Sequence, residues 1–227
     1  MLKKLKAAVL QANLDLVKQG LVVHTWGNVS GRDIKSGLIV IKPSGVSYKK
    51  MKAEDMVVLD PEGKVIEGKY KPSTDAQTHI ILYNTWSSIG GIVHTHSTYA
   101  TSWAQAGRAI PVFGTTHADH FYGAVPCSRK LSEKEVNDNY EINTGRVIVE
   151  VLKDFDPLAV PSVLINGHGP FCWGIDAEDA VYNAVTLEEV ARMAFYTVLL
   201  GNKEPADKYL IDKHFRRKHG KDAYYGQ

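Results

Sequence analysis

The sequence predicts an α+β protein: a three-layer α/β/α sandwich in which helices cover both sides of a largely antiparallel sheet. Short apolar runs of strand length, such as 38–41, 56–59 and 64–67, recur along the chain. The last two flank Asp60–Gly63, a hairpin signature that favours antiparallel pairing. Longer helical patterns stand between the strands, so helices are available to cover the sheet. No repeat or linker divides the chain, so we expect one domain over residues 1–227.

The composition is that of a soluble globular protein. Of the 227 residues, 44% are hydrophobic and 23% charged, and the formal net charge is +2, which gives no strong field for nucleic acid or a membrane surface. No apolar run approaches a membrane span, and the N-terminus lacks the apolar segment of a signal peptide. The two cysteines do not have metal-binding spacing, and a disulfide is not expected. We therefore expect a cytoplasmic protein that binds neither nucleic acid nor membranes.

The first third of the chain predicts a helix, a loop and a strand. Apolar residues from Leu2 to Leu16 follow a helical period that ends at Gly20. The small residues of Thr25–Gly31 predict a turn; the alternative is a loop whose backbone amides approach an anion. The strand 38–41 runs into Lys42–Gly45, which is either a phosphate cradle or an ordinary turn.

A second candidate anion site precedes the next helix, which carries His79 and Tyr83. Ser73, Thr74 and Asp75 are good N-cap residues, and capping alone explains them. The alternative is a phosphate bound by free amides and hydroxyls at the helix N-terminus, with the carboxylate turned toward a metal.

A strand at Ile92–Ser97 holds the most informative pair of residues. Successive side chains along a strand point to opposite faces, so His94 and His96 share one side, with Cα atoms roughly 7 Å apart. A catalytic zinc commonly takes three protein ligands and keeps one position open. His168 stands between two glycines at the end of the strand 163–165, so it is the candidate third ligand.

The remaining elements are mostly helical. A helix is expected at 98–105, and a polar stretch at Thr115–His120 contains Asp119, which is either a general base or a helix cap. A capping box at Ser132–Glu135 predicts a short helix, and the alternation over 146–152 predicts a strand. Asp176 is expected to cap a long helix that ends at Gly201, and 208–218 predicts a last helix.

Five blocks together resemble the class II aldolase/epimerase (adducin-like) family, and in particular its L-ribulose-5-phosphate 4-epimerases. The likeness covers essentially the whole chain. The blocks are Thr25–Ser30, Ile41–Gly45, Gly90–His96, Gly114–Asp119 and Tyr224–Gln227. The resemblance implies a metal-dependent conversion of L-ribulose 5-phosphate to D-xylulose 5-phosphate by a homotetramer with active sites between neighbouring subunits.

The resemblance also implies roles for individual residues. Zn²⁺, or Mn²⁺ or Co²⁺, would be bound by His94, His96 and His168, with Asp75 nearby. Asp119 and Tyr225 match the acid/base pair, and Tyr225 would serve the site of an adjacent chain. The residues matched to substrate binding are Gly27, Asn28, Lys42, Ser44, Gly45, Ser73, Thr74, Thr115, His214 and Arg217.

The implied chemistry explains these residue types. The C4 hydrogen of the ketose is not acidic, so inversion requires cleavage and re-formation of the C3–C4 bond. A cation held by neutral imidazoles stabilises the developing negative charge, and two proton-handling groups serve opposite faces of the aldehyde fragment.

Two positions depart from the family pattern, and two other functions compete with epimerisation. Thr74 replaces the usual Ser and keeps the hydroxyl, and His120 replaces the usual Tyr beside Asp119. The first competitor is a fuculose-1-phosphate type aldolase, whose members carry a Glu base where this chain has Asp75. The second is a non-catalytic adducin-like binding module, which would have no need of the three histidines and Asp119.

Overall fold

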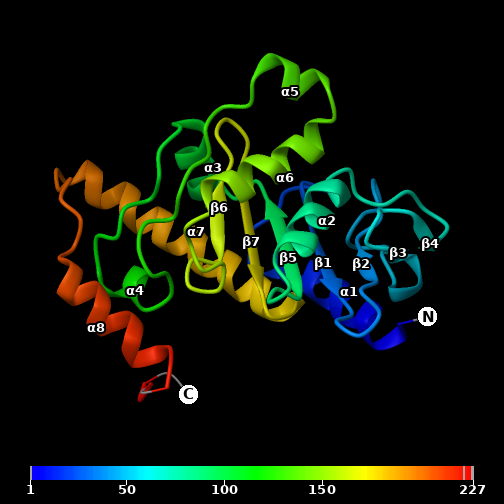
Figure 1. The fold of residues 1–227 in the computed structure, drawn as a ribbon, viewed down its shortest axis with the longest axis horizontal. Helices are drawn as coiled ribbons and strands as arrows, with labels where there is room; N and C mark the ends of the chain where they lie inside the picture. Colours follow the sequence, from blue (N-terminus) through cyan, green and yellow to red (C-terminus); the bar gives the residue numbers. More distant parts are fainter. Residues whose placement is uncertain (1, 222, 226–227) are drawn as a thin grey trace.

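The computed structural model describes residues 2–221 and 223–225, and its centre is one seven-stranded antiparallel sheet (Figure 1). The strand order is β4-β3-β2-β1-β5-β7-β6. The bounds of the strands are β1 Gly27–Arg32, β2 Ile39–Ile41, β3 Val57–Leu59, β4 Val65–Glu67, β5 Gly91–Thr95, β6 Ser162–Leu164 and β7 Pro170–Gly174.

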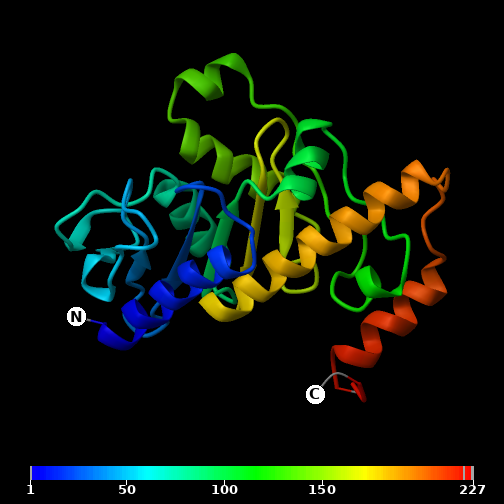
Figure 2. The same cartoon turned by 180° about the vertical axis from the view of Figure 1, so that it is seen from behind.

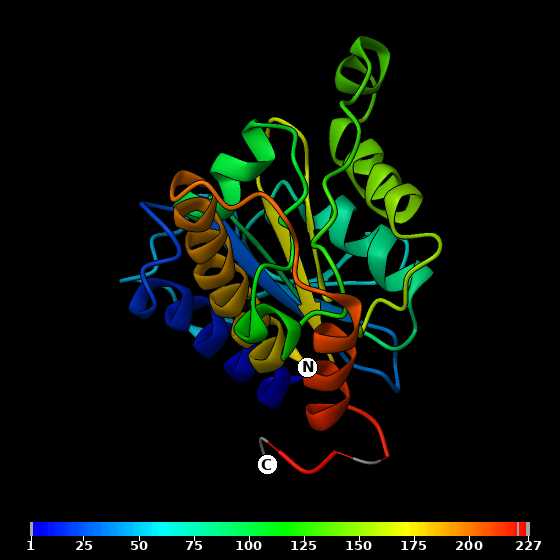
Figure 3. The ribbon, with the colours of Figure 1, turned by 90° about the vertical axis from the view of Figure 1, so that its left-hand side faces the viewer.

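Helices cover both faces of the sheet, as the sequence predicts. The two most prominent pairs are α1 and α7 on one face and α2 and α6 on the other, and the side view shows the three layers (Figure 3). The bounds are α1 Lys3–Lys18, η1 Ala53–Asp55, α2 Ala76–Thr85, α3 Thr98–Gln105, α4 Thr115–Ala118, α5 Glu133–Asn137, α6 Tyr140–Val151, α7 Ala177–Leu199 and α8 Lys208–Lys218.

The alternation of side chains along the strands produces two separate cores. Ile92 joins the core beneath α2 and α6, whereas the next residue, Val93, joins the core beneath α1 and α7. Phe171 and Cys172 divide in the same way. Figure 2 shows α1 and α7 lying across the second face. Because Ile92 faces α2, the even-numbered His94 on the same strand also faces α2 and α6.

The prediction of a strand at 146–152 is wrong, because these residues belong to helix α6. Their β-branched residues suggested a strand, but Thr144, Val147 and Ile148 are buried at helical spacing. Helix α6 packs closely on α2: a Cβ at Gly145 would lie 2.8 Å from the Cβ of Ile81. Close contact with another helix therefore overrides the local strand preference.

The prediction of a turn at Thr25–Gly31 is also wrong, because most of this stretch is the central strand β1. It pairs with β2 on one side and β5 on the other. Small residues are needed because α1 crosses it closely: a Cβ at Gly31 would lie 2.9 Å from Val9. Strand β7 was not anticipated either; it forms a hairpin with β6 that places His168 in the connecting turn.

Several local predictions are confirmed. Asp176 caps α7, with its carboxylate accepting from the Asp179 amide at 2.9 Å, and Ser132 and Glu135 form the capping box of α5. Both cysteines are free. None of the described helices, the 23-residue α7 included, combines the length and apolar character needed to cross a membrane.

Candidate active site

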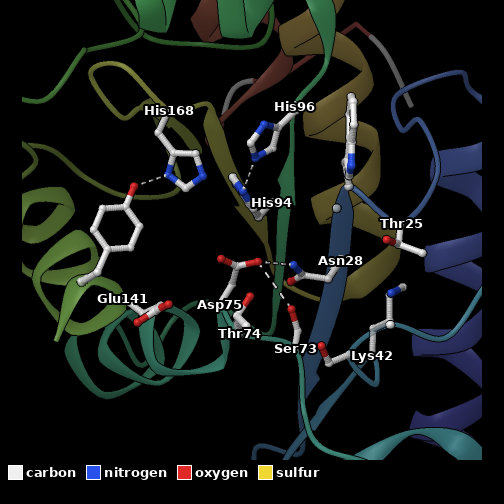
Figure 4. Close-up of a pocket in the computed structure, with 15 residues that line it drawn as sticks. Thr25, Asn28, Lys42, Ser73, Thr74, Asp75, His94, His96, Glu141 and His168 are labelled. Atoms are coloured by element: carbon white, nitrogen blue, oxygen red, sulfur yellow. Dashed lines mark hydrogen bonds between the residues drawn. The ribbon is translucent and has the colours of Figure 1, made fainter. Parts of the chain in front are cut away.

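Three histidines converge on the side of the sheet that faces α2 and α6 (Figure 4). His94 is on β5, His96 follows that strand, and His168 lies in the turn between β6 and β7. Their ligand nitrogens all lie within 4.8 Å of one another. The Nε2 atoms of His94 and His96 are 3.2 Å apart, close to the roughly 3.3 Å that tetrahedral zinc with 2.0–2.1 Å bonds would impose.

The second nitrogen of two of these rings is already engaged, which leaves Nε2 free for a metal. His94 Nδ1 donates to the carbonyl oxygen of Pro170 at 2.9 Å, so its Nε2 carries the lone pair. His168 Nδ1 lies 3.2 Å from the hydroxyl of Tyr140. Such outer contacts fix the tautomer and orientation of metal-binding histidines.

Burial favours the neutral imidazole, the form that binds a metal, at two of the three histidines. Burial, followed by the proximity of His94 and His96, lowers the pKa of His168 to about 3. Burial also lowers the pKa of His96. Three imidazole nitrogen donors around one point fit a divalent transition metal.

Two glycines let the β6–β7 turn approach β5. Gly167 has a φ of +75°, a conformation that other residues rarely adopt. A Cβ at Gly169 would lie 2.8 Å from the carbonyl oxygen of Thr95 and 3.6 Å from the His94 ring. The pattern of a histidine between glycines thus has a direct steric reason.

The histidines form one wall of a cavity of about 490 Å³, here called the metal pocket, which is within the usual size range of small-molecule sites. Eleven of the sixteen predicted site residues line it: Gly27, Asn28, Lys42, Ser44, Gly45, Ser73, Thr74, Asp75, His94, His96 and His168. The other lining residues are Thr25, Trp26, Tyr140 and Glu141.

Asp75 is not used to cap α2. Its side chain makes no capping hydrogen bond, and it accepts from Asn28 Nδ2 at 2.6 Å and from Ser73 Oγ at 3.4 Å. Burial acts to raise the pKa of Asp75, but nearby His94 and His79 and the bond from Asn28 outweigh it and lower the pKa. Asp75 lies outside the group of three converging histidines, so its carboxylate faces the pocket beside them.

Lys42 also lines the metal pocket; its ammonium donates to the Pro43 carbonyl oxygen at 3.3 Å and lies 5.0 Å from the ring centroid of Tyr48. Its side chain follows β2 and is almost completely inaccessible, with a relative exposure of 2%. Burial lowers the pKa of Lys42, whereas the charge of Asp75 raises it. A buried ammonium at the wall of a polar cavity, next to the N-terminus of α2, is suited to an anion.

The remaining five predicted residues assemble elsewhere in the chain, in a group here called the α8 cluster: Thr115, Asp119, His214, Arg217 and Tyr225. Asp119 accepts two hydrogen bonds from Arg217, at 2.9 and 2.7 Å, and one from His214 at 3.0 Å. The guanidinium of Arg217 also lies 4.4 Å from the ring centroid of Tyr225. None of these five residues lines the metal pocket of the same chain.

The electrostatics of Asp119 differ from those of a free carboxylate. Burial acts to raise its pKa, but the hydrogen bonds from Arg217 and His214 lower it further than burial raises it. Its side chain therefore does not cap a helix; it joins α4 to α8. Gly226 and Gln227, the last residues of the tail block, lie outside the described residues.

Sequence reasoning missed Tyr140 and Glu141. Both lie at the start of α6, where the incorrect strand prediction hid the helix N-terminus. The sequence indicated them in one way: Asn139–Glu141 directly precede residues whose apolar side chains also recur at helical spacing.

The model of the class II aldolase and adducin N-terminal domain matches residues 7–195. The chain belongs to the class II aldolase/adducin family. The family match contains the three histidines and the whole metal pocket, but ends before α8.

Within the family, curated relatives are close over their full length. The chain is 58% identical over 227 residues to the L-ribulose-5-phosphate 4-epimerase UlaF of Salmonella paratyphi A, with 100% of both chains covered. The relative of the same name from Salmonella typhi matches equally. These relatives share the full length, including the segment that carries the α8 cluster.

Solved structures share the fold. An L-fuculose 1-phosphate aldolase aligns with a TM-score of 0.79 at 23% identity and covers 94% of this chain and 95% of its own. The L-fuculose-1-phosphate aldolase of Thermus thermophilus aligns with a TM-score of 0.69 at 27% identity, over 90% and 100% of the two chains.

Proposed function

We propose that the protein is an isomerase that converts L-ribulose 5-phosphate to D-xylulose 5-phosphate. The observation that carries the proposal is the metal pocket, in which three converging imidazoles share a cavity wall with a buried lysine and a helix N-terminus. The full-length relatives named as this epimerase support the substrate.

His94, His96 and His168 would hold a divalent cation, with zinc as the proposed metal. When bound, such a cation supplies Lewis-acid stabilisation of negative charge on the sugar. An uncharged ligand such as imidazole preserves that acidity. Asp75 keeps Asn28 turned toward the substrate rather than acting as a fourth protein ligand.

Lys42 and the loops on either side of it would bind the phosphate. Ser44, Ser73 and Thr74 place hydroxyls at the wall of the metal pocket beside Gly45, and α2 directs its N-terminus there. Anchoring the phosphate holds the aldehyde fragment in place while the C3–C4 bond is open, so it can rotate and be attacked on its other face.

Asp119 and Tyr225 would handle the protons, one on each face of the fragment. The α8 cluster that contains them is separate from the metal pocket, so we propose that it completes the site of a neighbouring subunit in a homotetramer. Two features support this assembly: helix α8 has no buried residue, and Tyr225 is 53% exposed. Arg217 and His214 hold Asp119 ionised, ready to accept a proton, and Thr115 lies one helical turn before it.

We further propose that residues 1–227 form one domain and that the enzyme works in the cytoplasm on a small sugar phosphate, with no nucleic-acid or membrane partner.

Incubation of the metal-loaded protein with L-ribulose 5-phosphate tests the function. The expected product is D-xylulose 5-phosphate without free glycolaldehyde phosphate. Release of glycolaldehyde phosphate would identify an aldolase, and the Thermus thermophilus relative at 27% identity makes that the second candidate. Absence of either product, with the metal bound, would contradict both.

A further inference from the structure

A buried hydrogen-bonded group lies beneath the metal pocket, between β1 and α2. The Oγ atom of Ser30 is 2.7 Å from His79 Nδ1 and 2.8 Å from the hydroxyl of Tyr83. Ser30 and His79 have no exposed surface, and Tyr83 is 2% exposed. We call these three residues the β1–α2 network.

The network continues the contact that begins at the pocket. Asn28 and Ser30 point to the same face of β1, two residues apart, and Asp75 and His79 share one side of α2, about one turn apart. Asn28 binds Asp75 at 2.6 Å, so the two pairs are successive links between the strand and the helix. Asn28 and Asp75 line the metal pocket, and the β1–α2 network lies about one helical turn farther along α2.

The network also contacts the strands that carry the histidines. The His79 ring meets the Phe171 ring edge to face, with centroids 5.9 Å apart, and Phe171 stacks on His94 at 4.2 Å. Ser30 is directly opposite Ile92 on β5, the strand that carries His94. A shift of α2 would therefore change the distance between the phosphate-binding residues and the histidines.

The network is electrically neutral. Burial lowers the pKa of His79 to about 3 and raises that of Tyr83, so neither group ionises near neutral pH. In either imidazole tautomer, the Ser30 hydroxyl joins both side chains of α2 to the sheet, because a hydroxyl both donates and accepts. His79 Nε2 has no hydrogen-bond partner within the part of the chain that the structure describes. A core of ordinary apolar residues would avoid such a group, so its presence points to a geometric role.

We propose that Ser30, His79 and Tyr83 are positioning residues, which hold α2 in register with β1 and thereby place Ser73 and Thr74 for binding the phosphate of the substrate. This proposal takes the identity of the substrate from the proposed function. Its test with inorganic phosphate does not depend on that identity. None of the three residues lines the metal pocket, so they act through α2 and not on the substrate.

Ser30→Ala removes the central hydroxyl and tests the network. We expect about tenfold weaker binding of inorganic phosphate, equivalent to about 1.4 kcal/mol, and a similar rise in KM for L-ribulose 5-phosphate with a smaller change in kcat. Zinc content should be unchanged, because the histidines lie on β5, directly after β5 and in the β6–β7 turn, and not on α2. Amide exchange at His79, whose N–H donates to the Asp75 carbonyl at 3.1 Å, should become faster.

Ser162→Ala is the matched control, because it also deletes a fully buried serine hydroxyl, on β6 and away from α2. It should leave phosphate binding, KM and exchange at His79 as in the wild type, whatever its effect on Tm. Tyr83→Phe is the milder second variant if Ser30→Ala folds poorly, and it should show the same pattern at smaller amplitude.

The outcomes separate this proposal from the proposed function. If wild-type protein makes no D-xylulose 5-phosphate but Ser30→Ala still accelerates exchange at His79 and weakens phosphate binding, the function is wrong and the network stands. If amide exchange at His79 is unchanged in both Ser30→Ala and Tyr83→Phe, the positioning role is overturned. It is also overturned if Ser162→Ala weakens phosphate binding as much as Ser30→Ala does.

Discussion

Arg217 and Asp119 form a two-point ion pair, with Nε to Oδ1 at 2.9 Å and Nη2 to Oδ2 at 2.7 Å. The same guanidinium lies against the face of Tyr225. One side chain on α8 therefore holds both proposed proton-handling groups, and the relative placement of the two depends on it.

Tyr225→Phe should lower kcat by about 10²–10⁴-fold, because it removes one proton-handling hydroxyl and keeps the ring that contacts Arg217. Steady-state kinetics with L-ribulose 5-phosphate measures the loss, and circular dichroism checks the fold. Tyr224→Phe, at the neighbouring exposed tyrosine, is the control and should stay near the wild-type rate. An unchanged rate for Tyr225→Phe would require another proton donor.

His96→Asn should remove bound metal and activity together, since Nε2 of His96 is one of the converging donors. Metal content by atomic emission spectroscopy and the rate should fall in parallel, because a site with two imidazoles binds far more weakly than one with three. A variant that stays fully active without metal would refute the assignment of these ligands.

If the protein forms the proposed homotetramer, mixed assemblies of His96→Asn and Tyr225→Phe subunits should regain activity that neither parent possesses. If the α8 cluster serves a neighbouring chain, a hybrid contains some sites in which the intact metal pocket meets an intact Tyr225. Co-expression with two affinity tags yields the hybrids, and each variant mixed with itself is the control. Hybrids as inactive as the parents would place both groups in the site of one chain.

Gly169→Ala should abolish metal binding, because its Cβ would lie 2.8 Å from the Thr95 carbonyl oxygen and push the turn that carries His168 away from β5. Titration with Zn²⁺ measures the affinity. Gly114→Ala, where a Cβ meets nothing within 4 Å, should keep the wild-type affinity. Equal affinity in Gly169→Ala would show that the turn tolerates the shift.

Acid should destabilise the metal-free protein through its buried histidines. Burial lowers the pKa of His117 to about 4 and that of His79 to about 3, whereas an unfolded histidine titrates near 6.5. Between pH 6.5 and 4 the unfolded chain binds protons that the folded chain does not. As the pH is lowered from 6.5 to 4, the free energy of unfolding should therefore decrease by about 1.4 kcal/mol per pH unit for each such histidine.

Urea unfolding across this pH range measures the slope. His117→Gln, which keeps a donor for the Gly123 carbonyl, should reduce it by about 1.4 kcal/mol per unit. A slope equal to that of the wild type would mean that His117 is charged in the folded protein.

The sequence was most informative where one element determined the geometry by itself. His94 lies on β5 and His96 directly follows it, and their rings converge as the alternation of the pair predicted, although the strand ends at Thr95; Asp176 caps α7 through a local pattern. It failed where distant packing decided the outcome. Gly31 and Gly145 allow close approach of helices that are remote in sequence, so a central strand was interpreted as a turn and a helix as a strand. The separation of the α8 cluster from the metal pocket is likewise a tertiary property that no local pattern contains.

The three imidazoles are attached to strands, and to a turn between strands, that pair with one another in a single sheet. Their convergence is a result of folding, and does not require the cation to draw distant segments together. Chelation should therefore empty the site without unfolding the chain, and adding the ion back should restore the enzyme on the time scale of diffusion rather than of refolding.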